Sequence, residues 1–408
     1  MTQIMSREEF ERWLKDKPIN WLQVLTVRAG LRALPFDFPS GSYNQTIENE
    51  TLSLFRVFCI SWIACNFSEY DTAFAAASAA RSANNKSSEF NKMQLRVSTI
   101  AMLSGESHYK AQSGKNFKPD LSYEGSLYIF QSYFDSANLT DVYWKNCQED
   151  CYRLISYKNP LIAGHKITRK KLWPLGYDKN WKYSWWRIAG NLTDLDPTYQ
   201  VWIDWYNRRI KGHDAAFDIP GDNDRVHDKA ILARLVDATD EDFWSKGATY
   251  VNTTLQGWID EARQTAEFES IVCKLEAGAA THFGSPQERE ARSGLRTKLD
   301  TALPPAHAPI GHNHPPEDID PAETPILLPV IREEASAMLV TLDQPAPDVL
   351  AVAKTLSRWS KIKSTYQHDE FSKDFSGELG TSAARGIVVV LTTLCMLGLA
   401  WLKTVLGI

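Results

Sequence analysis

Hydrophobic residues recur at helical spacing along most of the chain. Ser6 and Glu9 form a capping-box pattern that predicts a helix to about residue 17, and apolar positions predict helices over 19–34 and 48–67. No stretch shows the sustained apolar–polar alternation that a half-buried strand needs. The pattern therefore predicts a mainly α fold. Further helices are expected over 68–83, 87–103, 121–136, 138–157, 222–237, 244–266, 267–280, 326–342 and 348–363.

The most apolar stretch runs from Gly386 to Ile408. Its residues 386–402 carry no charge, and Trp401 and Lys403 lie near one end, where they suit a membrane interface. A helix of this stretch is about 25–34 Å long, against roughly 30 Å of bilayer hydrocarbon. The two helices predicted before it form too small a module to enclose it. A single transmembrane helix is therefore predicted, with a buried core helix as the alternative.

Charges on either side of this stretch predict its orientation. Lys403 alone follows the main apolar run, whereas five basic residues precede it: Arg358, Lys361, Lys363, Lys373 and Arg385. The first residues contain acidic side chains and no apolar core, so they do not form a secretory signal. We expect a tail-anchored, single-pass protein of the inner (cell) membrane, with its body on the cytoplasmic side.

A proline-rich segment from Leu303 to Pro325 interrupts the helical pattern. Proline favours an extended, semi-rigid spacer over a packed core. The segment divides the chain into a multi-helical cytoplasmic body, a linker, a short helical module and the membrane helix. The predicted parts are an N-terminal helical domain at 1–160, a Trp-rich helical domain at 161–302, a Pro/His-rich linker at 303–325, a helical pair at 326–385 and a transmembrane anchor at 386–408.

Tryptophan is concentrated between residues 173 and 205. Asp196 and Pro197 there predict the N-cap and first turn of a helix that Gly212 ends. One face of this helix carries the candidate binding residues Trp202, Trp205, Tyr206 and Arg209. Such rings can fill a core, stack on a cation or anchor a partner protein. Core packing ranks first among these interpretations.

Three groups have the residue types of a metal site. They are His312 with His314 in the linker, Cys147 with Cys151 on one helical face, and the acidic group Asp222, Asp224, His227 and Asp228. The linker offers little preorganisation, the thiols have no third ligand nearby in sequence, and carboxylates in a first helical turn also complement the helix dipole. We therefore predict no metal site and no cofactor.

Composition narrows the functional class. The net charge of −5 gives no general electrostatic reason to expect nucleic acid binding. Six cysteines without disulfide-type spacing are typical of reduced thiols in the cytosol. The sequence contains no P-loop, no G-x-S-x-G, no H-E-x-x-H and no dinucleotide-binding glycine fingerprint. No catalytic residue is predicted, and a non-enzymatic protein is favoured.

Several segments resemble parts of uncharacterised alphaproteobacterial proteins. They are INWLQVLTVRAGLRALP at 19–35, VWIDWYNRRIKG at 201–212, FWSKGATYVNTTLQGWIDEA at 243–262 and IGHNHPPED at 310–318. The shared features are the GHNHPPE linker motif and an apolar C-terminal segment. The resemblance implies a modular helical architecture and carries no activity, ligand or catalytic residue.

The leading hypothesis is a non-enzymatic, tail-anchored membrane protein whose helical body binds a protein partner or a ligand. The alternative is a membrane-perturbing effector, anti-phage or toxin-like, acting through its C-terminal helices. Gly386 and Gly398 would permit the close helix approach that such a homo-oligomer needs. A metal-dependent hydrolase built on the acidic group is the weaker alternative.

Overall fold

In the computed structural model of the protein, the described part of the chain is helical and contains no strand. This confirms the predicted mainly α fold. The helices predicted over 68–83, 87–103 and 121–136 lie outside the described residues, as does the segment with His312 and His314. The described residues are 9, 12–13, 17, 19–37, 45–67, 141–157, 166–177, 179–222, 225–238, 243–303, 329–368 and 381–408.

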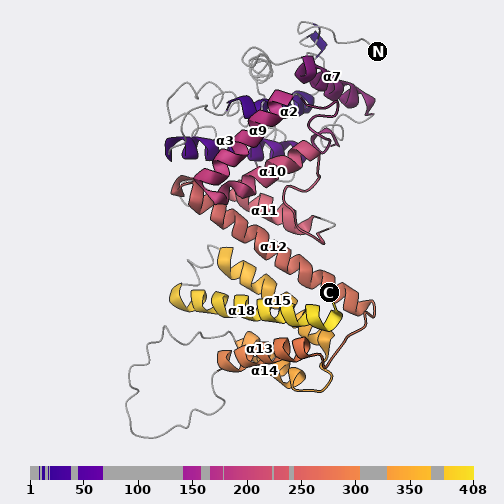
Figure 1. The fold of residues 1–408 in the computed structure, drawn as a ribbon, viewed down its shortest axis with the longest axis vertical. Helices are drawn as coiled ribbons and strands as arrows, with labels where there is room; N and C mark the ends of the chain where they lie inside the picture. Colours follow the sequence, from indigo (N-terminus) through magenta and orange to yellow (C-terminus); the bar gives the residue numbers. More distant parts are fainter. Residues whose placement is uncertain are drawn as a thin grey trace, which may run out of the picture. The chain divides into compact units, whose positions relative to one another are not determined.

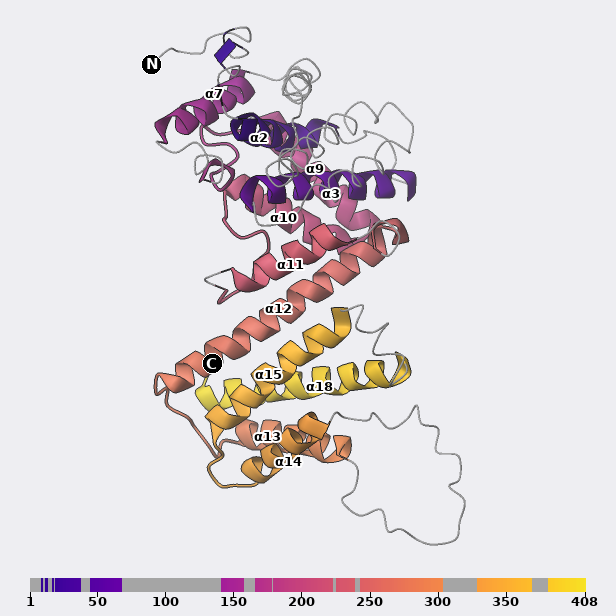
Figure 2. The ribbon, with the colours of Figure 1, turned by 180° about the vertical axis from the view of Figure 1, so that it is seen from behind.

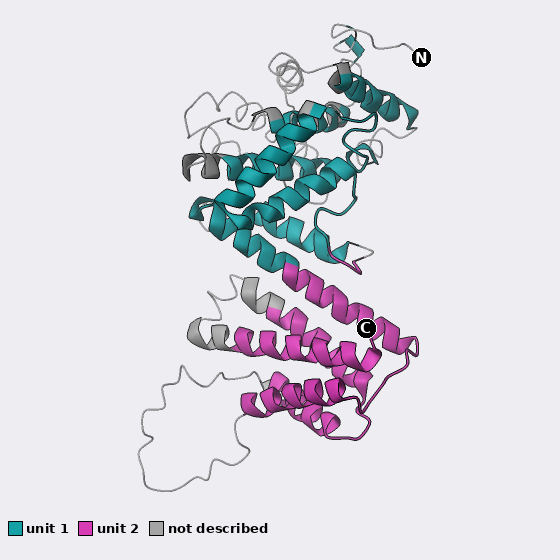
Figure 3. Ribbon diagram, viewed as in Figure 1, with its two compact units in different colours: residues 1–218, 224–259 teal, residues 219–223, 260–408 magenta. Residues whose placement is uncertain are grey.

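The chain divides into two compact units (Figure 3). Unit 1 comprises residues 1–218 and 224–259, and unit 2 comprises residues 219–223 and 260–408. The division falls inside one helix, α12 (Ala248–Glu276), and not at the proline-rich segment.

A single helix, α12, stands where the sequence pattern predicts two, over 244–266 and 267–280. Residues 262–270 contain neither glycine nor proline, so nothing in the backbone ends the helix between them. The two predicted helices are therefore one, and the boundary between the units falls within it, between Ile259 and Asp260.

Unit 1 is a stack of helices around an aromatic core. Within it α2 packs against α3, α7 and α9 (Figure 1). Trp62, Trp181, Trp202 and Trp205 are among its largest fully buried side chains. Its elements are α2 (Ile19–Asp37), α3 (Gln45–Asn66), α7 (Asp141–Ser156), α9 (Lys179–Leu195), the 3₁₀ turn η1 (Pro197–Tyr199), α10 (Gln200–Lys211), α11 (Val226–Asp237), the 3₁₀ turn η2 (Trp244–Lys246) and the first part of α12.

The start and end of the predicted aromatic helix are confirmed. Asp196 is the N-cap of η1 and accepts a hydrogen bond from the Thr198 backbone N–H at 2.8 Å, and Pro197 follows it. α10 continues from this turn to Lys211. Gly212 then ends it in the left-handed conformation, with φ 73°. A side chain there would also meet the Lys171 backbone nitrogen at 2.3 Å from its Cβ, so glycine is required twice over.

Unit 2 is a bundle built from the end of α12 with α13 (Pro286–Ala302), α14 (Pro329–Leu342), α15 (Val349–His368) and α18 (Thr381–Leu406). α18 packs along α13 and α15, and α14 packs along the same two helices (Figures 1 and 2). Their facing side chains form one continuous apolar core.

Helix α13 is absent from the helices predicted from the hydrophobic pattern. Its surface is mostly charged, so its apolar period is weak, and only Leu295 and Leu299 of its apolar side chains are fully buried. Its start does carry a capping signal: Ser285 Oγ accepts from the Glu288 N–H at 3.0 Å, and Pro286 occupies the first turn.

Candidate functional site

The four candidate binding residues lie inside unit 1. Trp202, Trp205 and Tyr206 are fully buried, and Arg209 is 3% exposed. The Trp202 ring stacks on Phe55 with centroids 5.7 Å apart, and its Nε1 donates to Asn252 Oδ1 at 2.7 Å. None of the four side chains therefore forms a surface on which a partner protein could dock.

Tyr206 connects three helices. Its hydroxyl donates to the Leu31 carbonyl in α2, and its ring meets Trp185 of α9 edge-on at 4.4 Å. Trp185 in turn donates from Nε1 to Asn207 Oδ1 at 2.9 Å. Burial raises the pKa of Tyr206 well above its ordinary value, so the hydroxyl stays protonated and keeps this hydrogen bond.

Arg209 lies over the face of Trp62 from α3, with its guanidinium carbon 4.0 Å from the ring centroid, and 6.0 Å from that of Trp205. Its Nη2 donates to the Ala215 carbonyl. Burial lowers the pKa of Arg209 to about 9, and the charge of Asp228 opposes that shift, so the group is a cation at neutral pH. Arg209 therefore already occupies the position over the Trp62 ring at which a ligand cation would stack.

Asp228 is the one buried residue among the described members of the acidic group that was considered as a metal site, and its role is structural. Asp228 accepts from the backbone N–H groups of Ala216 and Phe217 at 3.0 and 2.8 Å, which fixes the loop after α10. Asp224 lies outside the described residues. Within the part of the chain that the structure describes, no cluster of three or more His, Cys, Asp or Glu side chains could hold a metal ion.

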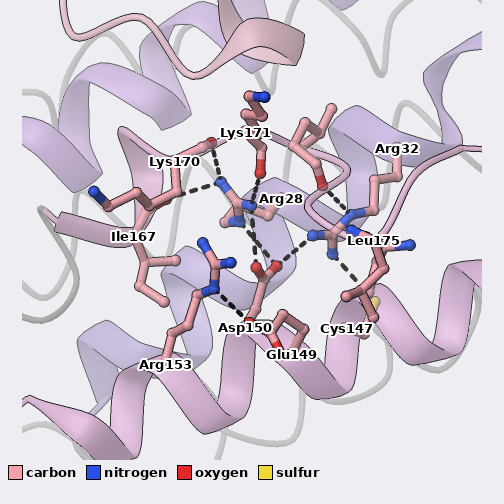
Figure 4. A network of polar contacts seen from close by, with 12 residues as sticks. Arg28, Arg32, Cys147, Glu149, Asp150, Arg153, Ile167, Lys170, Lys171 and Leu175 are labelled. Carbon is pink, nitrogen blue, oxygen red and sulfur yellow. Dashed lines mark hydrogen bonds and ion pairs between the residues drawn. The ribbon is translucent and has the colours of Figure 1, made fainter.

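A second buried polar cluster was not found by sequence reasoning. Arg28 and Arg32 on α2 converge on Asp150 of α7 (Figure 4). Arg28 places Nε and Nη2 on the two oxygens of Asp150 at 2.8 and 3.0 Å, and Arg32 Nη2 reaches Asp150 Oδ2 at 2.5 Å. All three side chains are at most 2% exposed. The available signal was two arginines four residues apart on a helix that carries no other charge before Asp37.

The same arginines also hold the segment before α9. Arg28 donates to the carbonyls of Ile167, Lys170 and Lys171 at 2.8 to 3.0 Å, so all five of its N–H groups are used. Arg32 donates to the Leu172 carbonyl at 2.8 Å. The cluster therefore ties α2, α7 and residues 167–172 together. With every donor of Arg28 occupied by the chain itself, the cluster is a structural element.

The two cysteines beside Asp150 are buried thiols. Arg32 Nη1 donates to Cys147 Sγ at 3.3 Å, yet burial still raises the pKa of Cys147 to about 11. Burial likewise raises the pKa of Cys151 well above its ordinary value. Neither is a thiolate at neutral pH, so neither is activated as a nucleophile or as a metal ligand.

Helix α18 is the remaining candidate for a functional element, as a possible membrane-spanning helix. Residues Ile387–Leu406 have a mean hydropathy of 1.9, and by length and composition they could cross a bilayer. Within unit 2 only 39% of this segment is buried. The prediction that the preceding helices offer α18 no groove is wrong, because α13, which the pattern missed, forms the second wall beside α15.

The docked side of α18 fits this groove closely. A Cβ at Gly398 would lie 2.3 Å from Leu356 Cδ1, so any larger residue would force the buried Leu356 side chain of α15 to move. Trp401 Nε1 donates to the buried Glu288 Oε1 at 3.0 Å, and Lys403 Nζ lies 2.6 Å from Glu267 Oε1. These contacts fix both the register and the rotation of α18 in the bundle.

The outward side of α18 is apolar as well. Val389 and Met396 are 64% and 63% exposed, and Thr393 and Ala400 continue their stripe at helical spacing. No charged residue occurs on any face of the helix between residues 386 and 402.

Comparison with known proteins found no match: no family model, no curated protein and no solved structure is similar to the chain. The resemblance to alphaproteobacterial proteins stays an expectation.

Proposed function

We propose that this protein is a non-enzymatic helical membrane protein that inserts α18 into a lipid bilayer, with its body on the cytoplasmic side of the inner membrane. The observation that carries the proposal is the apolar character of α18 on its exposed face as well as on its docked face. A helix packed at the edge of a soluble bundle needs an apolar stripe on one side only.

The neighbouring helix α13 provides the internal comparison. Both helices lie at the surface of the same bundle, but the exposed positions of α13 include Arg289, Lys298 and Asp300. Among residues 387–402 of α18, for which the structure describes side-chain exposure, the exposed positions are instead Val389, Met396 and Ala400. Water solvates the first set and not the second, so the outward side of α18 suits lipid.

The few polar groups of α18 are compatible with hydrocarbon. Thr392 and Thr393 donate their hydroxyls to the carbonyls of Val388 and Val389, one turn earlier, at 2.7 and 3.0 Å. They therefore need no water. Trp401 and Lys403 lie at the end of the apolar run, where an indole and an extended ammonium reach the interface.

The test uses arginine at the exposed positions, because they are outside the core. Val389→Arg with Met396→Arg leaves the core contacts of unit 2 intact but raises the insertion free energy, by about 2.5–3.5 kcal/mol at Met396 near the middle of the span and by less at Val389 near its end. We expect the wild-type chain to sediment with membranes and resist carbonate extraction, and this variant to be soluble and folded.

The matched control is Val330→Arg with Val340→Arg on α14. These valines are 62% and 67% exposed, so the same change is made at the same exposure on a different helix of unit 2. The control variant should remain in the membrane fraction. A wild-type chain that is soluble and monodisperse would make α18 a core helix and end the proposal.

The close fit of α18 in its groove favours a second candidate, a membrane-perturbing effector that keeps α18 docked until it is released. Gly398 against Leu356 and Trp401 on Glu288 are contacts that a permanently inserted helix would not use. This candidate predicts that the soluble protein releases dye from vesicles, and that Val389→Arg with Met396→Arg abolishes the release. A constitutive anchor inserts without leakage.

A further inference from the structure

The outward face of α9 in unit 1 combines aromatic and basic side chains. Tyr183 and Trp186 are 70% and 64% exposed, and Lys179 and Arg187 share their face at helical spacing. The opposite face of α9 is buried in the core through Trp181, Trp185, Ile188 and Leu192. We call Lys179, Lys182, Tyr183, Trp186 and Arg187 the α9 outer face.

The loop that enters α9 extends this composition. Leu175 and Tyr177 are 58% and 44% exposed. Between residues 166 and 187 the only acidic residue is Asp178, in a chain whose net charge is −5. The basic residues of that stretch are Lys166, Arg169, Lys170, Lys171, Lys179, Lys182 and Arg187.

The charges of the α9 outer face are available to a partner. In the described part of the chain no ion pair is formed by Lys179, Lys182 or Arg187, and Lys182 Nζ instead lies 4.3 Å from the Trp186 ring centroid. Basic residues of unit 2 such as Lys354 and Lys361 are paired with glutamates at 2.8 Å.

The α9 outer face is also held rigidly. Trp181 Nε1 donates to the Arg32 carbonyl at 2.8 Å, which connects α9 to the buried arginine cluster. Asn146 of α7 accepts from the Leu175 N–H and donates to the Gly176 carbonyl, both at 3.1 Å. Exposed Trp and Tyr are therefore presented in a fixed orientation, which lowers the entropy lost on binding.

We propose that the α9 outer face is a second membrane contact, which binds the headgroup region of a bilayer containing anionic phospholipids. Tyr and Trp have an apolar ring body and a polar N–H or O–H, the combination that partitions to the membrane–water interface. Lys and Arg beside them attract anionic headgroups. The inference goes beyond the proposed insertion of α18, because unit 1 alone carries it.

The test measures binding of the full chain with Val389→Arg and Met396→Arg, in which insertion of α18 is blocked. Vesicles of phosphatidylcholine alone are compared with vesicles that also contain phosphatidylglycerol, in about 0.1 M salt. Each Lys or Arg near an anionic surface strengthens binding about fivefold. Adding Lys179→Gln, Lys182→Gln and Arg187→Gln should therefore reduce the affinity for anionic vesicles at least tenfold. Replacing Tyr183 and Trp186 with Ala should also weaken it.

The charge-matched control carries Arg289→Gln, Lys298→Gln and Arg332→Gln, which are exposed in unit 2. It should bind anionic vesicles like its parent. If the control and the α9 variants lose equal affinity for anionic vesicles, the effect depends on net charge alone and the inference is overturned. So would unchanged binding by the α9 variants, or binding of a single-stranded oligonucleotide in place of vesicles, which would assign the surface to nucleic acid.

The two membrane proposals fail separately. If α18 does not insert, wild-type protein is extracted by carbonate, while salt-sensitive binding to anionic vesicles through α9 persists. If the α9 outer face does not bind lipid, carbonate resistance persists and the preference for anionic vesicles is absent.

Discussion

Unit 1 has charged side chains in its core, whereas most ion pairs of unit 2 lie near its surface. Unit 1 buries arginines in its core, where Arg28 and Arg32 share Asp150 and Arg209 stacks on Trp62. Unit 2 has an apolar core, and most of its ion pairs, such as Arg296 with Asp343, are formed by half-exposed side chains.

The difference indicates which unit can rearrange. Removing one member of a buried ion cluster leaves an uncompensated charge, so the helices of unit 1 are locked together. Half-exposed pairs contribute little, so unit 2 depends on apolar contacts, and the proposed insertion of α18 would exchange some of them for contacts with lipid. Glu288, the buried carboxylate that accepts a hydrogen bond from Trp401 Nε1, also pairs with Arg292 of its own helix at 3.1 Å. The proposed release of α18 would therefore leave no isolated charge in the groove.

The largest effect is expected when the buried cluster of unit 1 is broken. Asp150→Ala leaves two arginines facing each other without a counter-charge and should lower the free energy of unfolding by about 3–5 kcal/mol. Hydrogen exchange of α2 and α7 would report the loss. The control is Glu149→Ala, next in sequence, whose pair with Arg153 is about one-third exposed and should contribute at most about 1 kcal/mol. Similar losses in both variants would remove the contrast between the units.

The next effect concerns the groove of unit 2. Gly398→Ala places a methyl group 2.3 Å from Leu356 Cδ1 and should destabilise the docked α18 by about 1–3 kcal/mol. We expect faster hydrogen exchange in α18 and stronger membrane binding. Gly294→Ala on α13, where a Cβ meets nothing within 4 Å, is the control and should stabilise by about 0.4–1 kcal/mol. Weaker membrane binding by Gly398→Ala would show that the groove does not compete with the bilayer.

Two tryptophans of α10 separate ring packing from hydrogen bonding in unit 1. Trp202→Phe removes the N–H that donates a hydrogen bond to Asn252 Oδ1. It should lower the free energy of unfolding by about 1 kcal/mol more than Trp205→Phe does. Trp205 Nε1 has no hydrogen-bond partner among the described residues. Urea unfolding of both variants measures the difference. Equal losses would mean that packing of the rings alone decides stability.

The smallest effect is expected at the exposed pair of unit 2. The hydrogen bond from Arg296 lowers the pKa of Asp343 below its ordinary value of 3.8. A carboxyl with a lowered folded-state pKa stabilises the fold above its ordinary pKa, and this contribution is lost as the pH falls through the lowered value. Asp343→Asn should therefore change the urea midpoint slightly at pH 7 and not at about pH 2. A large change at pH 7 would contradict the comparison of the units.

Periodicity was sufficient wherever one helix buried one clear stripe. The mainly α fold, the capped helix at Asp196 to Gly212 and the apolar character of Gly386 to Ile408 follow from local chemistry, namely the i, i+3, i+4 spacing, side-chain caps, and a glycine where φ is positive. A surface helix such as α13 buries too few apolar residues to give that signal.

Tertiary structure alone decided the roles of the polar residues. Arg28 and Asp150 are 122 residues apart in sequence, and nothing local indicates that they meet. Arg209 has the spacing to stack on Trp205 within its own helix, yet it packs more closely on Trp62 of α3. The apolar stretch at 386–408 determines by its composition that α18 needs either a groove or a bilayer. The groove itself exists only because α13 and α15 come together, since burial is a property of the assembled fold.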